Sequence, residues 1–206
     1  MYQRSDPGGS GVQSMKDVLI IGAGGNIAGK VIDLLSREED VHLTLFLRNA
    51  ARLGNHAVAK ARIFEGNALN VNDLENAMTG IDIVYANLAG DLENMARNIV
   101  KAMKNKGVKR LIFISSIGIY DTPLKPVLRP YRKAADIIER SATEYTILRP
   151  TWFTSADEVD YEITKKGQPE KGSVVSQKSL ATFIATIIKS PDKYVRENLG
   201  INKPNS

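Results

Sequence analysis

The sequence predicts an α/β protein: a doubly wound parallel sheet flanked by helices, in three α/β/α layers. Three observations support this fold class. The chain has 206 residues, which is the length of one domain with a sizeable core. Strand-like and helix-like segments alternate from Lys16 onward, with short connections. A glycine-rich turn, Gly22–Gly25, directly follows the first strand-like segment.

The predicted strands are short apolar segments. The first, Val18–Ile21, is wholly apolar, as expected of a strand that is covered by helices on both faces. The main sheet is expected to contain residues 18–21, 42–47, 62–64, 81–86, 110–114 and 145–148. Residues 162–166 and 173–175 are candidate edge strands.

The helix after the glycine turn is expected at residues 26–36. It places Ile27, Val31, Leu34 and Leu35 on one face, the spacing of an amphipathic helix. Three more helices are expected at residues 91–106, 130–140 and 179–189.

Capping signals mark the ends of several helices. Asn72 is expected to cap a helix between the third and fourth strands, with Glu75 three residues later in a capping-box-like pattern. Gly80 is expected at the C′ position of that helix. Gly107 is expected to end the next helix, and Pro191 follows the last one.

The composition excludes several classes of site. The chain has no cysteine, so it has no disulfide and no cysteine nucleophile. Its two histidines, His42 and His56, lie fourteen residues apart, and we expect no metal centre. The longest unbroken aliphatic run has four residues, whereas a membrane-spanning helix needs about 20.

The formal net charge of +5 suits an anionic ligand, but the basic residues form no block. We therefore expect a mildly basic cytoplasmic protein that binds neither nucleic acid nor a membrane. Residues 1–14 contain three glycines and three serines without periodicity, which predicts a disordered leader without a secretory signal.

The glycine turn is the strongest functional signal in the sequence. Gly22 permits a tight turn, and Gly24 and Gly25 allow a close approach of the backbone to a pyrophosphate. The first residues of the following helix, Asn26 and Ile27, would present free N–H groups to the phosphates. In this strand-turn-helix context, the motif predicts a dinucleotide site in a Rossmann-type fold.

The end of the second strand favours NADP over NAD. Sites for NAD place an acidic residue there to bind the ribose, whereas this chain has Arg48, followed by Asn49 and Arg52. A guanidinium can bind the 2′-phosphate of NADP with two hydrogen bonds. We therefore expect NADPH to be preferred over NADH.

With these residues in place, the chain resembles the short-chain dehydrogenase/reductase superfamily. It is most similar to the atypical, single-domain NAD(P)H-binding branch with NmrA-like and biliverdin-reductase-B-like proteins. The resemblance implies one NAD(P)-binding domain over residues 15–206, with a small C-terminal segment on the substrate side. It rests on residues 22–28, Leu47-Arg48-Asn49, Gly66-Asn67-Ala68, Asn87-Leu88-Ala89-Gly90, residues 115–120, Lys133 and Leu148-Arg149-Pro150.

The resemblance also implies roles for single residues. Asn67, with Ala68 beside it, would accept a hydrogen bond from the adenine amino group, and Lys133 would hold the nicotinamide ribose. Ser116 would bind the carbonyl oxygen of the substrate. The remaining cofactor contacts would come from Asn87, Leu88 and Ala89 at the end of the fourth strand and from Pro150 beside the carboxamide.

One departure from the family pattern bears on catalysis. The family's proton-donating tyrosine lies four residues before the lysine, where this chain has Arg129. Tyr131 lies two residues before Lys133 and would face another side of the helix. Without that pair, the tyrosine pKa is not lowered by the lysine charge, and ordinary carbonyl reduction loses its usual acid.

Three interpretations of the catalysis remain open. The protein is a reductase that passes hydride from NADPH to a flavin, a quinone or a tetrapyrrole-like acceptor, with water or Ser116 supplying the proton. Alternatively, Tyr120 supplies the proton. As a third interpretation, the protein binds NADP without turnover, as a redox sensor of the NmrA type. The candidate catalytic residues are therefore Ser116, Tyr120 and Lys133.

The substrate side is less clearly marked. Trp152 and Phe153 are either a stacking surface for a planar acceptor or aromatic residues at the edge of the core. Residues 117–129 form either a cationic lid or a solvated loop. We expect a small-molecule acceptor, planar or anionic, and not a bulky nucleotide sugar. The sequence leaves the oligomeric state open.

Overall fold

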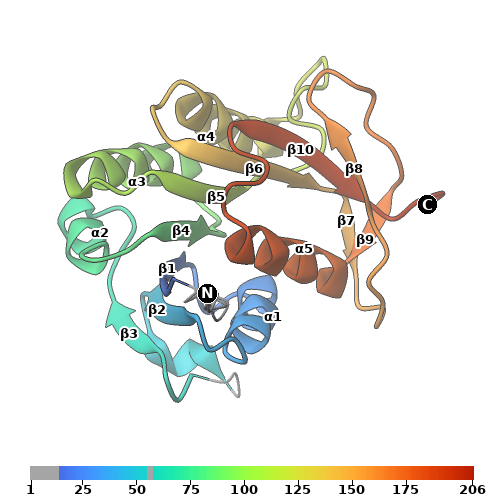
Figure 1. Cartoon of the computed structure of the whole chain (residues 1–206). Helices are drawn as coiled ribbons and strands as arrows, with labels where there is room; N and C mark the ends of the chain where they lie inside the picture. The colour runs from blue at the N-terminus through green and yellow to red at the C-terminus, as the bar shows by residue number, and fades with distance from the viewer. Residues whose placement is uncertain (1–13, 55–57) are drawn as a thin grey trace, which may run out of the picture.

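The computed structural model describes residues 14–54 and 58–206. Eight strands form one sheet in the order β3-β2-β1-β4-β5-β6-β10-β8, in which β8 alone is antiparallel to its neighbour (Figure 1). These strands are β1 (Lys16–Ile21), β2 (Val41–Leu47), β3 (Arg62–Glu65), β4 (Ile83–Ala86), β5 (Arg110–Ile114), β6 (Glu144–Pro150), β8 (Glu162–Lys165) and β10 (Glu197–Asn202).

Helices cover both faces of the sheet (Figure 1). The helices α1 (Asn26–Leu35) and α5 (Gln177–Lys189) pack on one face. The helices α2 (Val71–Ala77), α3 (Leu92–Lys106) and α4 (Arg129–Glu139) pack on the other. This is the predicted doubly wound α/β fold, and the fold class is confirmed.

The apolar sequence of Val18–Ile21, the buried part of β1, follows from its central place in the sheet. Val18 and Ile20 are buried among α1 and α5, whereas Leu19 and Ile21 are buried among α2 and α3. Because successive side chains point to opposite faces, a strand covered on both sides has no position for a polar residue.

Two strands at the C-terminal side of the chain were not predicted. Strand β10 pairs with β6 in parallel, and β7 (Trp152–Thr154) pairs with β9 (Val174–Ser176) in a separate two-stranded sheet. The sequence of β10, Glu-Asn-Leu-Gly-Ile-Asn, carries polar residues that are buried here by pairing with distant segments. The candidate edge strand at 173–175 is β9, shifted by one residue.

The predicted caps of α2 were wrong. The helix begins at Val71 with Asn70 as its N-cap, and the Asn70 side chain accepts a hydrogen bond from the Asn72 N–H at 3.0 Å. The helix ends at Ala77 with Met78 as its C-cap, so Gly80 lies beyond the C′ position. Gly80 still has a positive φ of 77°, because the chain turns there toward β4.

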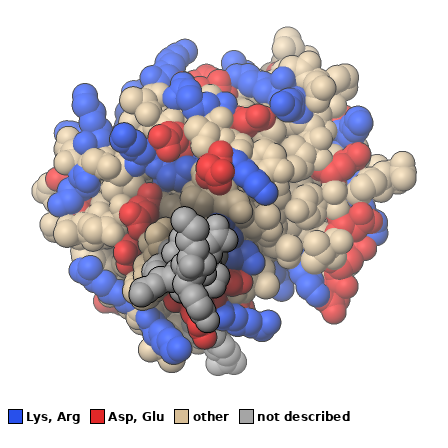
Figure 2. All heavy atoms as spheres, viewed as in Figure 1, with Lys and Arg blue, Asp and Glu red and all other residues tan. Residues whose placement is uncertain are grey.

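Two small 3₁₀ helices, η1 (Ala50–Leu53) and η2 (Pro126–Leu128), complete the elements. On the face shown in Figure 2, lysine and arginine side chains are interspersed with aspartates and glutamates. Among the described residues, no helix is long and apolar enough to cross a membrane. The predicted leader, residues 1–14, lies outside the described residues except for Ser14, and His56 also lies outside them.

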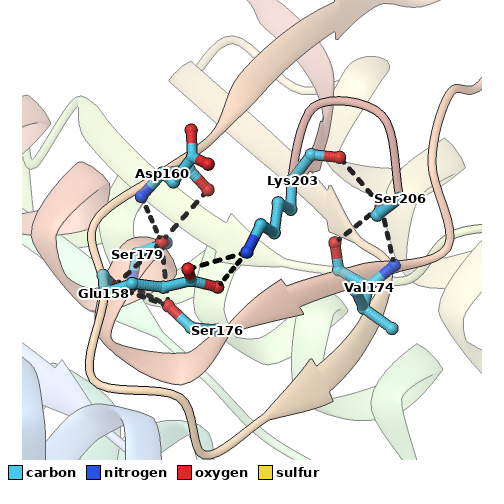
Figure 3. Close-up of polar contacts among 7 residues, drawn as sticks. All are labelled: Glu158, Asp160, Val174, Ser176, Ser179, Lys203 and Ser206. Carbon is cyan, nitrogen blue, oxygen red and sulfur yellow. Dashed lines mark hydrogen bonds and ion pairs between the residues drawn. The ribbon is translucent and has the colours of Figure 1, made fainter.

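Hydrogen bonds and an ion pair connect the C-terminal residues to the start of α5 (Figure 3). Ser176 is the N-cap of α5, and its hydroxyl accepts from the Ser179 N–H at 2.9 Å and donates to the Glu158 main-chain oxygen at 2.8 Å. The Glu158 carboxylate in turn pairs with Lys203, with 2.7 Å between Oε2 and Nζ. The chain after β10 is thereby fixed against the loop that follows β7.

Candidate functional site

A cleft of about 550 Å³ opens at the carboxyl ends of the strands around β1. It is lined by the turns and loops that follow β1, β2, β3 and β4. In the sheet, β1 lies between β2 and β4, so the chain winds in opposite directions on its two sides. Such a switch point is where open α/β sheets bind their ligands. We call this the nucleotide cleft.

The structure brings nine of the thirteen predicted cofactor residues into the nucleotide cleft. These are Gly22, Gly24, Gly25, Arg48, Asn67, Ala68, Asn87, Leu88 and Ala89. Asn26, Ile27, Lys133 and Pro150 are not among the residues that line it.

The glycine turn is fixed by close backbone contacts. Gly22 has a φ of +85°, and a Cβ atom added there would lie only 2.1 Å from the main-chain oxygen of Asn87. The N–H groups of Gly22 and Ala23 both donate to the Phe46 oxygen, at 3.0 and 3.2 Å. Hydrogen bonds to β2 and a close contact with the end of β4 therefore hold the turn, and Gly22 admits no side chain.

The start of α1 has no side-chain cap among the described residues. Gly25 is the N-cap, and it has no side chain that could bond to the first-turn N–H groups. Asn26 and Ile27, although outside the cleft lining, supply two of these first N–H groups. An uncapped helix N-terminus carries unsatisfied donors and the positive end of the helix dipole, so it favours a phosphate.

Two arginines lie where the adenosine end of a dinucleotide would be bound. Arg48 directly follows β2, and Arg52 on η1 also lines the cleft. The Asn49 side-chain oxygen is already engaged, because it accepts a hydrogen bond from the Ala51 N–H at 2.9 Å and caps η1. Sequence reasoning noted Arg52 but did not include it among the site residues.

The residues after β3 and β4 form the other walls. Asn67 Oδ1 accepts from the Leu69 N–H at 2.9 Å, which leaves one lone pair on that oxygen for an adenine amino group. Asn87 Nδ2 lies 3.3 Å from the hydroxyl of Tyr85, whose pKa is raised by burial. Gly66, which was not among the predicted cofactor residues, also lines the cleft, and a Cβ atom added there would lie only 2.7 Å from the Phe46 ring.

Comparison with known proteins identifies the family. The family model for NAD(P)H-binding proteins matches residues 22–191. The chain belongs to the NAD(P)H-binding family. A search of the curated proteins gave no match.

Solved structures of similar proteins agree with the resemblance found in the sequence. A Rossmann-fold NAD(P)-binding family protein from Shigella flexneri is 48% identical, with a TM-score of 0.87 over 93% of this chain and 95% of that one. A short-chain dehydrogenase/reductase from Veillonella parvula, solved in complex with NADP, is 28% identical, with a TM-score of 0.83 over 92% and 95%. ChuY, an anaerobillin reductase from Escherichia coli O157:H7, shares the fold at 17% identity, with a TM-score of 0.81 over 93% and 98%. The predicted resemblance to the atypical short-chain dehydrogenase/reductase group is confirmed.

Each of the three candidate catalytic residues of this NAD(P)H-binding protein bonds to a group outside that set. The Ser116 hydroxyl donates to the main-chain oxygen of Ile117 at 3.1 Å. Lys133 on α4 is 2.9 Å from Glu93 in the first turn of α3. Arg129 is the first residue of α4, one helical turn before Lys133.

Tyr120 lies in a different environment, away from the residues that line the nucleotide cleft. Its hydroxyl donates to Glu139 at 2.9 Å and accepts from the Asn198 side chain at 2.7 Å. Burial and the Glu139 carboxylate raise the pKa of Tyr120. Because the Tyr120 proton is directed at Glu139, it could reach a hydride acceptor only after that hydrogen bond breaks.

The remaining predicted residues lie at the edges of the site. Pro150 ends β6, and its oxygen accepts from the Ile117 N–H at 3.1 Å, so it lies beneath the loop that carries Ser116. Trp152 is 76% exposed and Phe153 is 44% exposed on β7. These aromatic side chains are available for stacking. Among the described residues, no group of three or more histidines, aspartates or glutamates is arranged to hold a metal.

Proposed function

We propose that this protein binds NADP(H), with NADPH preferred over NADH, and passes hydride to a small planar acceptor of the flavin, quinone or tetrapyrrole type. The observation that carries the cofactor preference is the pair of arginines, Arg48 and Arg52, in the nucleotide cleft after β2. An NAD site would place a carboxylate there. The NADP complex of the Veillonella relative supports the same choice.

The residues of the nucleotide cleft fit a dinucleotide. The Gly22 backbone packs closely against Asn87, and the start of α1 is uncapped. This arrangement leaves backbone N–H groups for a pyrophosphate. Arg48 and Arg52 would bind the 2′-phosphate, and Asn67 the adenine amino group. Bound NADPH supplies the hydride.

The chain's own part in the reaction is to hold and orient the reactants and to supply a proton. A planar acceptor needs no carbonyl-activating tyrosine, because its ring system accepts the negative charge of the hydride. Ser116, at the end of β5, would then supply or relay a proton, or water would do so. The likeness in fold to ChuY, an anaerobillin reductase, supports a tetrapyrrole-like acceptor.

A second function, an NADP(H) sensor without turnover, is favoured by a specific observation. Each candidate catalytic group is engaged elsewhere in the structure: Ser116 with Ile117, Lys133 with Glu93, and Tyr120 with Glu139. In this alternative, the nucleotide cleft reports the redox state of the cofactor to a partner protein.

We keep the other predictions from the sequence as parts of the proposal. The acceptor is a small molecule, and neither nucleic acid nor a membrane is a partner. The mixed charges on the face in Figure 2 support the first of these exclusions. A cytoplasmic location remains a prediction.

Calorimetric titration with NADPH and NADH tests the cofactor preference. We expect the wild-type protein to bind NADPH at least about tenfold more tightly, since a charge-assisted pair contributes roughly 1.5–3 kcal/mol. Arg48→Glu should remove the preference. Arg62→Glu, the same charge change on an exposed residue of β3 outside the cleft, is the matched control and should bind as wild type.

A panel of flavins, quinones and small aldehydes on the same sample separates the two functions. Oxidation of NADPH by a planar acceptor is the expected result. Tight binding of NADPH without turnover of any acceptor would favour the sensor. Equal affinity for NADPH and NADH in the wild-type protein would contradict the assignment of the arginines.

A further inference from the structure

A buried arginine and a loop glutamate form a second polar site, and neither residue lines the nucleotide cleft. Arg149, the penultimate residue of β6, is only 2% exposed. Its Nε donates to the Asn198 side chain on β10 at 2.8 Å, and its Nη1 pairs with the Glu170 carboxylate. Among the described residues, its Nη2 has no hydrogen-bond partner. A buried guanidinium with an unused donor retains capacity to bind an anion.

Glu170 is held at two points. One carboxylate oxygen meets Arg149, and the other accepts a hydrogen bond from the Gly118 N–H at 3.1 Å. Gly118 belongs to the loop after β5, two residues beyond Ser116. A guanidinium and a backbone N–H aimed at the two oxygens of one carboxylate form a complementary receptor for that group. This receptor stands at the carboxyl ends of β5 and β6, the edge of the sheet where such folds bind substrates.

The segment that carries Glu170 lies on the surface of the molecule. It connects β8 to β9, and Gly167 and Gly172, both with positive φ, bracket it. A Cβ atom at Gly167 would meet nothing within 4 Å. Arg149, in contrast, is fixed by the sheet through Asn198. Departure of Glu170 therefore moves a loop and leaves the sheet and the arginine in place.

Space for a ligand lies beside this pair. A hollow of about 610 Å³ is lined by Tyr120, Asp121, Arg149 and residues 166–170. The Lys166 Nζ lies 4.7 Å from the centre of the Tyr120 ring. The hollow thus combines the Tyr120 ring, the Lys166 ammonium, the Asp121 carboxylate and the Arg149 guanidinium of the receptor.

We propose that Arg149 and the Gly118 N–H form a binding site for a carboxylate of the acceptor, and that Glu170 fills this site in the protein without acceptor. The inference rests on the proposed function in one respect: the carboxylate belongs to the hydride acceptor. An acidic planar molecule would displace Glu170 and gain the unused Nη2 donor.

The test compares two probes that differ only in charge, an anthraquinone carboxylate and its carboxamide. Their affinities are measured by calorimetry without NADPH, for the wild-type protein, Glu170→Gln and Glu197→Gln. Glu197 pairs with Lys165 at 3.7 Å on the neighbouring strands, so its variant makes the same change of charge outside the receptor. We expect Glu170→Gln to bind the carboxylate roughly tenfold more tightly than wild type, because the internal competitor has lost its charge. The carboxamide should bind all three proteins equally.

An equal change for both probes, or no change for either, would overturn the proposal and leave the Arg149–Glu170 pair with a structural role alone. If Glu170→Gln does not fold, a measurement on the wild-type protein alone still tests the proposal. The backbone amide resonance of Gly118 should shift on addition of the carboxylate and not on addition of the carboxamide, whereas an identical response to both probes would contradict the site.

The same probes distinguish failure of this site from failure of the proposed reductase. If the expected affinities appear but NADPH is not oxidised by the bound quinone, the carboxylate site stands and the reductase activity falls. If both probes are reduced at equal rates by all three proteins, the reductase stands and the carboxylate site falls.

Discussion

The two halves of the sheet form their sites from different kinds of groups. From β1 to β4, backbone contacts shape the nucleotide cleft at the turn of Gly22, the start of α1 and the strand ends, and Arg48 and Arg52 add their side chains. From β5 to β10, the polar groups are side chains from distant parts of the chain, such as Arg149 with Glu170. The comparison teaches that one half has a shape set by local conformation, and the other has a shape set by long-range packing.

The largest effect is expected from Gly22→Ala in the backbone-built half. The added Cβ would overlap the Asn87 oxygen, so the variant should lose more than about 4 kcal/mol of unfolding free energy and bind no NADPH. Gly25→Ala is the matched control, because its φ of −77° suits alanine and its Cβ would lie 3.5 Å from the Gly22 oxygen.

Urea unfolding and NADPH titration measure both glycine variants. Gly25→Ala should keep its stability within about 1 kcal/mol but lose NADPH affinity, because its methyl group occupies the space for the pyrophosphate. Wild-type affinity in Gly25→Ala would show that the phosphates do not approach this turn.

The next largest effect is expected from Arg110→Met in the half built from side chains. Arg110 is 4% exposed and donates to the main-chain oxygens of Pro191, Lys193 and Glu144 and to the Thr146 hydroxyl, at 2.6–3.0 Å. Removing these donors leaves buried acceptors unsatisfied, at a cost of about 3 kcal/mol.

Urea unfolding should show this loss for Arg110→Met, with NADPH affinity unchanged in the protein that remains folded. Arg110→Lys keeps the charge but cannot reach the same acceptors, and it should recover only part of the loss. A fall in NADPH affinity without a fall in stability would mean that the two halves are coupled, contrary to the comparison.

The same contrast explains what the sequence could predict. The alternation of main-sheet strands with helices, the glycine turn and Arg48 at the end of the second strand follow from local patterns: apolar runs, glycines at fixed spacing and the residue at a strand end. The start of α2 was ambiguous at this level, because Asn70 and Asn72 are both good capping residues.

Strand β10 and the surroundings of Tyr120 were beyond local patterns. Asn198 is buried only because Tyr120 and Arg149, 78 and 49 residues away, provide its hydrogen-bond partners. No spacing in the sequence indicates that such segments meet. The pairing of Glu170 with Arg149 is hidden for the same reason, since neither residue belongs to a motif that names the other.

A third prediction concerns the acid stability of the half built from side chains. Burial alone would raise the pKa of Glu139, but hydrogen bonds from Lys166, Asn198 and Tyr120 outweigh it, and the pKa is lowered from 4.5. A carboxyl with a lowered folded-state pKa contributes stability that is present above the unfolded-state value and lost as the pH falls through the folded-state value. The contribution of Glu139 should therefore be complete above about pH 4.5 and be lost as the pH falls further, through the lowered folded-state pKa.

Urea midpoints measured across the acid range test this expectation. Glu139→Gln should be less stable than wild type at neutral pH, and its midpoint should fall less steeply below the titration range of glutamate. If the urea midpoints of the two proteins fall equally steeply with decreasing pH, the Glu139 contacts do not persist in solution.

The smallest effect is expected at the boundary between the halves, where Lys133 and Glu93 join α4 to α3. The Lys133 side chain is 60% exposed, and pairs of this kind contribute little to stability. Neither Lys133→Met nor Glu93→Gln should shift the thermal midpoint measurably. Their effects on NADPH affinity should differ in sign, because Glu93 competes with the nicotinamide ribose for the Lys133 ammonium. Lys133→Met should weaken binding, and Glu93→Gln should strengthen it by about twofold, a small fraction of a charge-assisted hydrogen bond. If both variants bind NADPH as the wild-type protein does, the cofactor is held entirely from β1 to β4, and α4 contributes only to the acceptor side.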